Sequence, residues 1–377
     1  MHAISQIILP FDLYAEKNIL IRVPAFNTKD SLTLFFDTGA ATMVLDNAAA
    51  ERYQIKADMK QGISGASGTK IYQYATGRTL QLTSSVAIFR VNFVLDDLSR
   101  LNATVGRKFD GIIGNDILKN YLTVIDFTNR RLLLYSFNQK LDTKGYTEIG
   151  FNFSDGRPIP ELPVSIKLLN GDDLSGNVLY DSGAGLTLMV NMPFQQKNDL
   201  MRKVGKRVES TQDNLSNKSV TTLAAIGGLK LGPFNFNQKL RINISTDQAG
   251  VSAYEGYLGI LGAEIINRFD QIIDYNAKRI YLKPNYLNKK NFVTTVPPVK
   301  LSLKDNKVII SSIIKDSPAY RSGLREGQTI VSINGRSNTD LQFYKEMMLK
   351  ENEELEVAYL DANDHINKCR FKIEKLL

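Results

Sequence analysis

Apolar and polar residues alternate in short runs along most of the chain, which is the pattern of half-buried β-strands. Such runs occupy 19–23, 32–36, 162–168 and 178–180. Helical periodicity is scarce before residue 282 and is confined to short stretches at 46–53 and 115–121. The pattern predicts a mostly β protein, with one barrel-like lobe in each half of this region.

The last part of the chain has a different pattern. A polar stretch that ends in Pro297-Pro298 predicts a linker at 285–296. Beyond it, strands are expected at 308–314, 328–333, 355–360 and 368–373, with an amphipathic helix at 340–349. We therefore expect a third, smaller β domain with a helix over residues 297–377.

A repeat divides the region before the linker. Asp37-Thr38-Gly39-Ala40 and Asp181-Ser182-Gly183-Ala184 each follow an apolar run. Further along, Gly111-Ile112-Ile113-Gly114 corresponds to Gly259-Ile260-Leu261-Gly262, and an aspartate follows 12 positions after the last glycine in both copies. This shared register indicates two copies of one structural unit, at 1–150 and 151–284.

Composition excludes several kinds of chemistry. With two histidines and one cysteine among 377 residues, almost no material exists for a Ser-His-Asp triad, a Cys-His pair or a His-rich zinc site. We therefore expect no metal and no cofactor. The net charge of +8 comes from short basic clusters without interleaved aromatics, so no nucleic-acid partner is expected.

Membrane and export signals are also missing from the pattern. No apolar run approaches the roughly 18 residues of a membrane span, so we expect no transmembrane segment. Residues 1–13 lack a cationic start followed by a long apolar stretch, so no signal peptide is visible in this chain.

The two repeated acids offer a specific chemistry. Two carboxylates about 3 Å apart cannot both ionise, so they share a proton and act as acid and base at once. If Asp37 and Asp181 face each other, the ionised member can take a proton from water while the protonated member polarises a carbonyl. The alternative is that both acids only begin turns after strands. The shared downstream spacing favours the catalytic interpretation, whereas Asp126 and Asp274 have the pattern of hairpin turns.

These motifs resemble known families. The duplicated Asp-Thr/Ser-Gly-Ala, each followed at a distance by two apolar residues and a glycine, resembles the aspartic proteases, and Ala40 and Ala184 are similar to the retropepsin branch. Residues 19–282 resemble a tandem pair of bacterial retropepsin-like aspartyl protease units. Ser317-Pro318-Ala319 and Ser332-Ile333-Asn334-Gly335 resemble parts of a PDZ domain.

The protease resemblance implies two lobes related by pseudo-twofold symmetry and a role for each motif residue. Asp37 and Asp181 would be catalytic, and a monomer would be sufficient for the active site. The residues supporting the dyad would be Thr38, Gly39, Ser182, Gly183, Gly114 and Gly262. A substrate-covering flap would have its tip at Gly65, Ala66, Ser67 and Gly68, although an ordinary surface hairpin is the alternative. The equivalent stretch of the second copy has no glycine, so we expect one working flap.

The PDZ resemblance places a peptide groove at Lys300, Leu301, Ser302 and Leu303. No glycine-containing loop precedes this strand, so the groove is expected to bind an internal segment or to dock on the protease lobes. Together, the resemblances imply an aspartic endopeptidase that cuts extended polypeptide, with a PDZ domain for recruitment or regulation. The alternatives are a non-catalytic peptide-binding protein that retains the cleft and a PDZ-centred scaffold. A periplasmic or cell-envelope location is implied by the resemblance alone.

Overall fold

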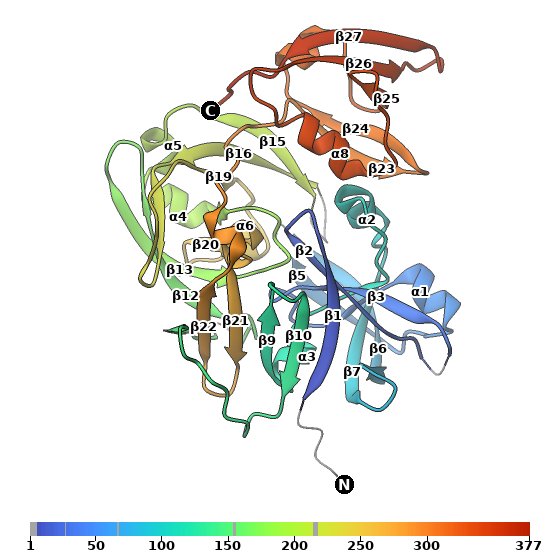
Figure 1. Cartoon of the computed structure of the whole chain (residues 1–377), viewed down its shortest axis with the longest axis vertical. Coiled ribbons are helices and arrows are strands. Elements are labelled where there is room, and N and C mark those ends of the chain that lie inside the picture. Colours follow the sequence, from blue (N-terminus) through green and yellow to red (C-terminus); the bar gives the residue numbers. More distant parts are fainter. Residues whose placement is uncertain (1–5, 27, 66–67, 154–155, 214–217) are drawn as a thin grey trace.

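The computed structural model describes residues 6–26, 28–65, 68–153, 156–213 and 218–377. Their strands form three sheets of 13, nine and five strands, so the expected mostly β architecture is confirmed (Figure 1). The described part has no helix long and apolar enough to cross a membrane.

The first half of the chain supplies most of the largest sheet and three short helices. Its strands are β1 (Ile7–Tyr14), β2 (Asn18–Pro24), β3 (Ser31–Phe36), β4 (Val44–Asp46), β5 (Met59–Gly65), β6 (Gly68–Gln81), β7 (Ala87–Asp96), β8 (Gly111–Ile113), β9 (Leu122–Asp126), β10 (Arg131–Tyr135) and β11 (Thr147–Gly150). Its helices are α1 (Asn47–Arg52), α2 (Ser99–Val105) and α3 (Asn115–Leu118).

The second half builds the nine-stranded sheet and adds two strands to the largest one. Its strands are β12 (Glu161–Lys167), β13 (Asp173–Tyr180), β14 (Leu188–Val190), β15 (Val208–Asp213), β16 (Lys218–Ile226), β17 (Gly228–Leu231), β18 (Phe234–Phe236), β19 (Leu240–Ser245), β20 (Gly259–Leu261), β21 (Phe269–Asp274) and β22 (Arg279–Pro284). Its helices are α4 (Met192–Lys197), α5 (Leu200–Lys203), α6 (Ala263–Ile266) and the 3-10 turn η1 (Val251–Ala253).

The two halves repeat one set of strand pairings, as the sequence repeat predicts. Strand β3 runs parallel to β8, with Phe36 opposite Ile113, and β13 runs parallel to β20, with Tyr180 opposite Leu261. Strands β8 and β20 also pair antiparallel with β4 and β14, respectively. Asp37 therefore directly follows β3, which lies beside β8, and Asp181 directly follows β13, which lies beside β20.

A continuous sheet joins the lobes. Strand β9 of the first half pairs antiparallel with β21 of the second, with Val124 opposite Ile272. Strand β11, which lies within 1–150, pairs with β22 of the second half. Asp126 and Asp274 end β9 and β21 and accept backbone N–H groups of the following turns, from Asn129 at 2.9 Å and Ala277 at 2.9 Å.

The segment after β22 is anchored on the second lobe. It contains the 3-10 turn η2 (Tyr286–Lys289). The Arg268 guanidinium donates to the carbonyls of Leu287 at 3.0 Å and Lys290 at 2.6 Å, and Arg241 donates to the carbonyl of Thr295 at 2.6 Å. Although 285–296 is polar, much of it is therefore fixed to the protein surface.

The C-terminal domain has its own sheet and core. Its elements are β23 (Val299–Lys304), β24 (Lys307–Ile313), α7 (Pro318–Arg321), β25 (Thr329–Ile333), α8 (Leu341–Met347), β26 (Glu354–Leu360) and β27 (Ile366–Lys372). Ile310, Leu341 and Val357 are fully buried in one cluster. Strand β23 lies at the edge of the sheet.

Candidate active site

The two motif aspartates meet at the interface between the lobes. The backbone N–H of Asp37 donates to the carbonyl of Ile113 at 2.9 Å, and that of Asp181 donates to Leu261 at 3.1 Å. Asp37 and Asp181 are half-buried, and their carboxyl groups lie close enough to share the N–H of Gly183 as a hydrogen-bond donor. Residues far apart in the chain thus form one acidic pair.

Backbone N–H groups surround this pair. Gly183 N–H lies 3.1 Å from Asp37 Oδ1 and 2.9 Å from Asp181 Oδ1, so it donates to both carboxyls. Gly39 N–H donates to Asp37 Oδ1 at 2.7 Å, and Ala184 N–H donates to Asp181 Oδ1 at 3.0 Å. These donors stabilise the single negative charge that a shared-proton pair carries.

The glycines beside the pair leave no space for a side chain. A Cβ atom at Gly39 would lie 2.4 Å from Cγ of Asp181, and one at Gly183 would lie 2.3 Å from Cγ of Asp37. A Cβ at Gly114 would lie 1.8 Å from the carbonyl oxygen of Asp37, and one at Gly262 would lie 2.2 Å from that of Leu186. Gly39 and Gly183 thus let the backbone approach a carboxyl group, and Gly114 and Gly262 let it approach a backbone carbonyl. This close approach is a steric reason for glycine at the four positions.

Thr38 and Ser182 connect the two loops. The Thr38 N–H donates to Ser182 Oγ at 3.0 Å, and the Ser182 N–H donates to Thr38 Oγ1 at 2.9 Å. The Thr38 hydroxyl in turn donates to the carbonyl of Tyr180 at 2.7 Å. Both hydroxyl residues are buried, so this reciprocal arrangement holds the aspartates in register across the lobe interface.

Burial dominates the electrostatics of the pair. Burial, the charge of Asp181 and the hydrogen bond with Asp181 raise the pKa of Asp37 well above its usual value. Burial also raises the pKa of Asp181, against the lowering effects of the hydrogen bond with Asp37 and of the N–H groups of Ala184 and Gly183. The pair therefore keeps one proton to higher pH than an ordinary aspartate does.

The expected flap residues lie at the end of a hairpin. Strands β5 and β6 pair antiparallel, with Gly65 opposite Gly68, and Ala66 and Ser67 lie outside the described residues. The second half also forms a hairpin here, from β15 and β16, with Thr211 opposite Val220. Glycine was therefore not needed for strand pairing in the second copy.

The expected PDZ groove residues lie on β23, and this face of the C-terminal domain is docked on the first and second lobes. Helix α8 and the first-lobe helix α2 both lie against β23 (Figure 1). The Tyr14 hydroxyl donates to Asp340 Oδ1 at 2.7 Å, and Arg107 donates to Asp340 Oδ2 at 2.9 Å. Strand β23 therefore faces α2 of the same chain.

Two lysines of the C-terminal domain complete the docked face. Lys345 donates to the carbonyl of Thr104 at 2.6 Å, and Lys300 donates to the carbonyl of Thr211 in β15. Burial, together with the positive charge of Lys17, lowers the pKa of Lys345 to about 8. The domain thus contacts both lobes.

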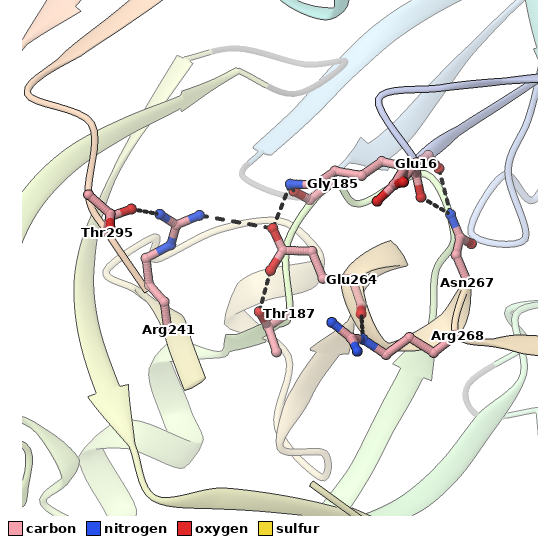
Figure 2. A network of polar contacts seen from close by, with 9 residues as sticks. Glu16, Gly185, Thr187, Arg241, Glu264, Asn267, Arg268 and Thr295 are labelled. Atoms are coloured by element: carbon pink, nitrogen blue, oxygen red, sulfur yellow. Dashed lines mark hydrogen bonds and ion pairs between the residues drawn. The ribbon is translucent and has the colours of Figure 1, made fainter. Parts of the chain in front are cut away.

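A second polar centre, which the sequence analysis did not identify, is built around Glu264 of α6 (Figure 2). Burial alone would raise the pKa of Glu264, but the charges of Lys17 and Arg241 and hydrogen bonds from Lys17 and Thr187 lower it to about 2. One signal was available in the sequence. Glu264 and Asp116 both lie two positions after the repeated glycine.

Metal-binding clusters are absent from the part of the chain that the structure describes. Within it, no group of three or more His, Cys, Asp or Glu side chains is arranged to hold a metal ion.

Two family models match parts of the sequence, and a solved structure resembles it at low identity. The structure is similar to the crystal structure of aspartic proteinase from Irpex lacteus, with a TM-score of 0.48 and 14% sequence identity over 76% of this chain and 99% of that chain. No curated protein matches the sequence. Residues 25–117 match the family model described as aspartyl protease, and residues 309–359 match that of the PDZ domain. The chain thus contains an aspartyl protease domain and a C-terminal PDZ domain.

Proposed function

We propose that the protein is an aspartic endopeptidase that hydrolyses peptide bonds in extended polypeptide. The observation that carries this proposal is that the carboxyls of Asp37 and Asp181, one from each lobe, lie side by side and accept the same N–H of Gly183. The family match ends at residue 117, so the role of Asp181 rests on this geometry.

The reaction follows from one proton shared by two carboxyls. The ionised carboxyl takes a proton from a water molecule held between them, while the protonated one donates to the carbonyl oxygen of the substrate. Water adds to the carbonyl carbon and forms a tetrahedral gem-diol. When the C–N bond breaks, the leaving nitrogen takes the proton that came from water, and a gem-diol hydroxyl returns its proton to the other carboxyl, which restores the pair. The N–H groups of Gly39, Gly183 and Ala184 hold the carboxyls in place throughout.

Inhibitors of different classes test this proposal on an unfolded protein substrate. We expect cleavage to be blocked by a statine-type transition-state mimic and to resist chelators and reagents for serine and cysteine nucleophiles. The reason is that the proposed nucleophile is water activated by carboxyls, with no covalent intermediate. The measurement is the rate of appearance of new N-termini. Complete loss of cleavage on chelation would contradict the proposal.

The pH dependence of hydrolysis is expected to be bell-shaped and centred in mildly acidic to near-neutral conditions. Activity falls on the alkaline side when the pair loses its shared proton, and on the acid side when the pair gains a second one. The acid and alkaline limbs of the profile both lie at higher pH than for an ordinary pair, because the pKa values of Asp37 and Asp181 are raised. In addition, Ala40 and Ala184 carry no hydroxyl that could donate to the ionised pair.

The measurement is kcat/KM against pH on an uncharged peptide, in the range where the protein is folded. An optimum like that of gastric pepsins, with little activity above about pH 4, would show that other groups set the pKa values of the pair.

The main alternative is a binding protein that holds extended peptides without cutting them. Both carboxyls and all four N–H contacts of a working pair are present, which favours hydrolysis. A protein of the alternative kind would protect a bound peptide and release it intact in the same assay.

For the PDZ domain, we propose regulation of the protease rather than simple recruitment of substrate. The supporting observation is that its β23 face is docked on α2, so an incoming peptide that adds to this edge must compete with α2. Because the same face holds β15 through Lys300, its release would also change the surroundings of the second hairpin.

The double variant Tyr14→Phe/Arg107→Ala tests this docking. It removes both first-lobe partners of Asp340: the half-buried hydrogen bond from Tyr14, which contributes about 1.5–3 kcal/mol, and the exposed ion pair with Arg107, which contributes up to about 1 kcal/mol. We expect amide hydrogen exchange in β23 to become roughly 10-fold faster or more, because local opening costs less free energy. Lys108→Ala, which removes the exposed neighbouring cation, is the matched control. Unchanged exchange in the double variant would show that these contacts do not protect the groove.

A further inference from the structure

The carboxylate of Glu264, in the second lobe, forms an ion pair with Lys17 of the first lobe. Lys17, in the turn between β1 and β2, places Nζ 2.5 Å from Oε1 of Glu264, and the two side chains are 35% and 11% exposed. The other oxygen of Glu264 accepts the Thr187 hydroxyl at 2.6 Å (Figure 2). Lys17 Nζ also lies 3.3 Å from the carbonyl oxygen of Gly185, to which it donates.

The loop that these contacts hold is the one that carries Asp181. The Ala263 N–H donates to the carbonyl of Ala184 at 2.8 Å, and the Gly262 N–H donates to that of Thr187 at 3.1 Å. The loop from Asp181 to Thr187 is thus attached to the start of α6, on which Glu264 lies. A displacement of Glu264 or of Gly185 would therefore also displace the loop that carries the Asp181 carboxyl.

The cationic turn is itself held in position. The Asn267 side-chain amide donates to the carbonyls of Glu16 at 3.2 Å and Lys17 at 2.9 Å, and Asn267 is buried. Lys290 of the linker also binds Glu16. Lys17 therefore extends from a backbone that is fixed against the second lobe, so its ammonium group reaches Glu264 at little cost in conformational entropy.

In the first lobe, the equivalent acidic residue pairs with a lysine of its own lobe. Asp116 occupies the position equivalent to Glu264, two residues after the repeated glycine, and accepts the N–H of Met43 at 2.8 Å. Its cation is Lys119 of the same lobe, at 2.7 Å. The acidic loop of the first lobe is thus completed within its own lobe, whereas Glu264 pairs with Arg241 of its own lobe at 3.9 Å and, at 2.5 Å, with Lys17 of the other lobe.

We propose that Lys17 is a positioning residue, which acts through Glu264 and Gly185 to fix the Asp181 loop relative to the lobe that carries Asp37. The proposal rests on the proposed endopeptidase function. Without Lys17, the Thr38–Ser182 contacts still join the loops, but the second loop loses the hydrogen bond from Lys17 to Gly185, and Glu264 loses its first-lobe partner. The distance between the two carboxyls then varies more.

This role predicts a specific kinetic signature. Misplacement of a catalytic group by about 1 Å costs on the order of 100-fold in rate, so Lys17→Met is expected to lower kcat by about that factor with little change in KM. The bell-shaped pH profile of kcat should also become narrower. The repulsion and shared proton that separate the two apparent pKa values weaken when the carboxyls move apart.

The experiment compares Lys17→Met with Lys119→Met in the full chain, on the same peptide substrate and with thermal unfolding measured in parallel. Each change removes the nearest cation of the acidic residue two positions after the repeated glycine, but only the first breaks a contact between lobes. We expect Lys119→Met to retain kcat and the width of the pH profile. Lys17→Arg, which keeps the charge, should recover at least part of kcat.

The double variant Lys17→Met/Glu264→Gln keeps the test available if the single variant does not fold, because it also removes the carboxylate that has lost its nearest cation. We expect it to be more stable than Lys17→Met and still low in kcat. Wild-type kcat and pH width in the double variant, or a loss confined to thermal stability or KM, would overturn the positioning role. An inactive wild type, or an Asp37→Asn variant as active as the wild type, would instead remove the proposed function itself.

Discussion

The Asp37→Asn variant is expected to lose about 10⁴-fold in kcat/KM on an unfolded protein substrate, the upper range for loss of general acid–base catalysis. An amide cannot share a proton with Asp181, so neither the activation of water nor the protonation of the substrate carbonyl is available. The amide oxygen can still accept the N–H groups of Gly39 and Gly183, so the local structure should be preserved.

Stability separates loss of chemistry from loss of fold in this variant. Because the pKa of Asp37 is raised in the folded state, ionisation of its carboxyl disfavours folding as the pH rises through that value. Asn at this position removes that cost, so the melting temperature at neutral pH should be equal to or higher than that of the wild type. Asp126→Asn changes the other repeated type of aspartate, at a hairpin turn, and serves as the control that keeps activity. If Asp37→Asn retains more than about a tenth of wild-type activity, the shared-proton mechanism is wrong.

Gly183→Ala is expected to lower kcat at least about 100-fold and to destabilise the protein by about 1–3 kcal/mol. The added methyl group would lie 2.3 Å from both Cγ and Oδ2 of Asp37, which is far inside van der Waals contact. The Asp37 carboxyl and the Gly183 loop cannot both keep their positions, so the N–H bridge from Gly183 to the two carboxyls is lost.

Steady-state kinetics and denaturant midpoints measure the two effects of this change. Gly205→Ala is a matched control, because a Cβ atom there has no neighbour within 4 Å. A Gly183→Ala variant with wild-type kcat and an unchanged midpoint would show that the loop can move away without consequence, and that close approach is not a requirement of the site.

Much of the candidate site was visible in the chain because its parts are local and repeated. The residues before Asp37 and Asp181 are apolar over several positions, so each acid was expected at a strand end, and β3 and β13 end directly before them. The equal spacing from Gly114 and Gly262 to the next aspartate indicated that both copies have one topology, which the matching strand pairings confirm. Helix α8 was expected for the same kind of reason, since its apolar residues recur at helical spacing.

What the sequence by itself determined was therefore the type of each strand, the duplication and the residue types at the acidic loops, since periodicity and spacing encode these directly. Only the tertiary structure decided which distant groups meet. Lys17 and Glu264 lie 247 positions apart, and Tyr14 and Asp340 lie 326 apart. No local pattern distinguishes such a lysine or tyrosine from any other surface residue. Pairing of β9 with β21 joins the two lobes, and this brings Lys17 to Glu264. The anchored linker places β23 against α2, and this brings Asp340 to Tyr14. Both contacts therefore depend on long-range packing that fixes the lobes and the PDZ domain in space.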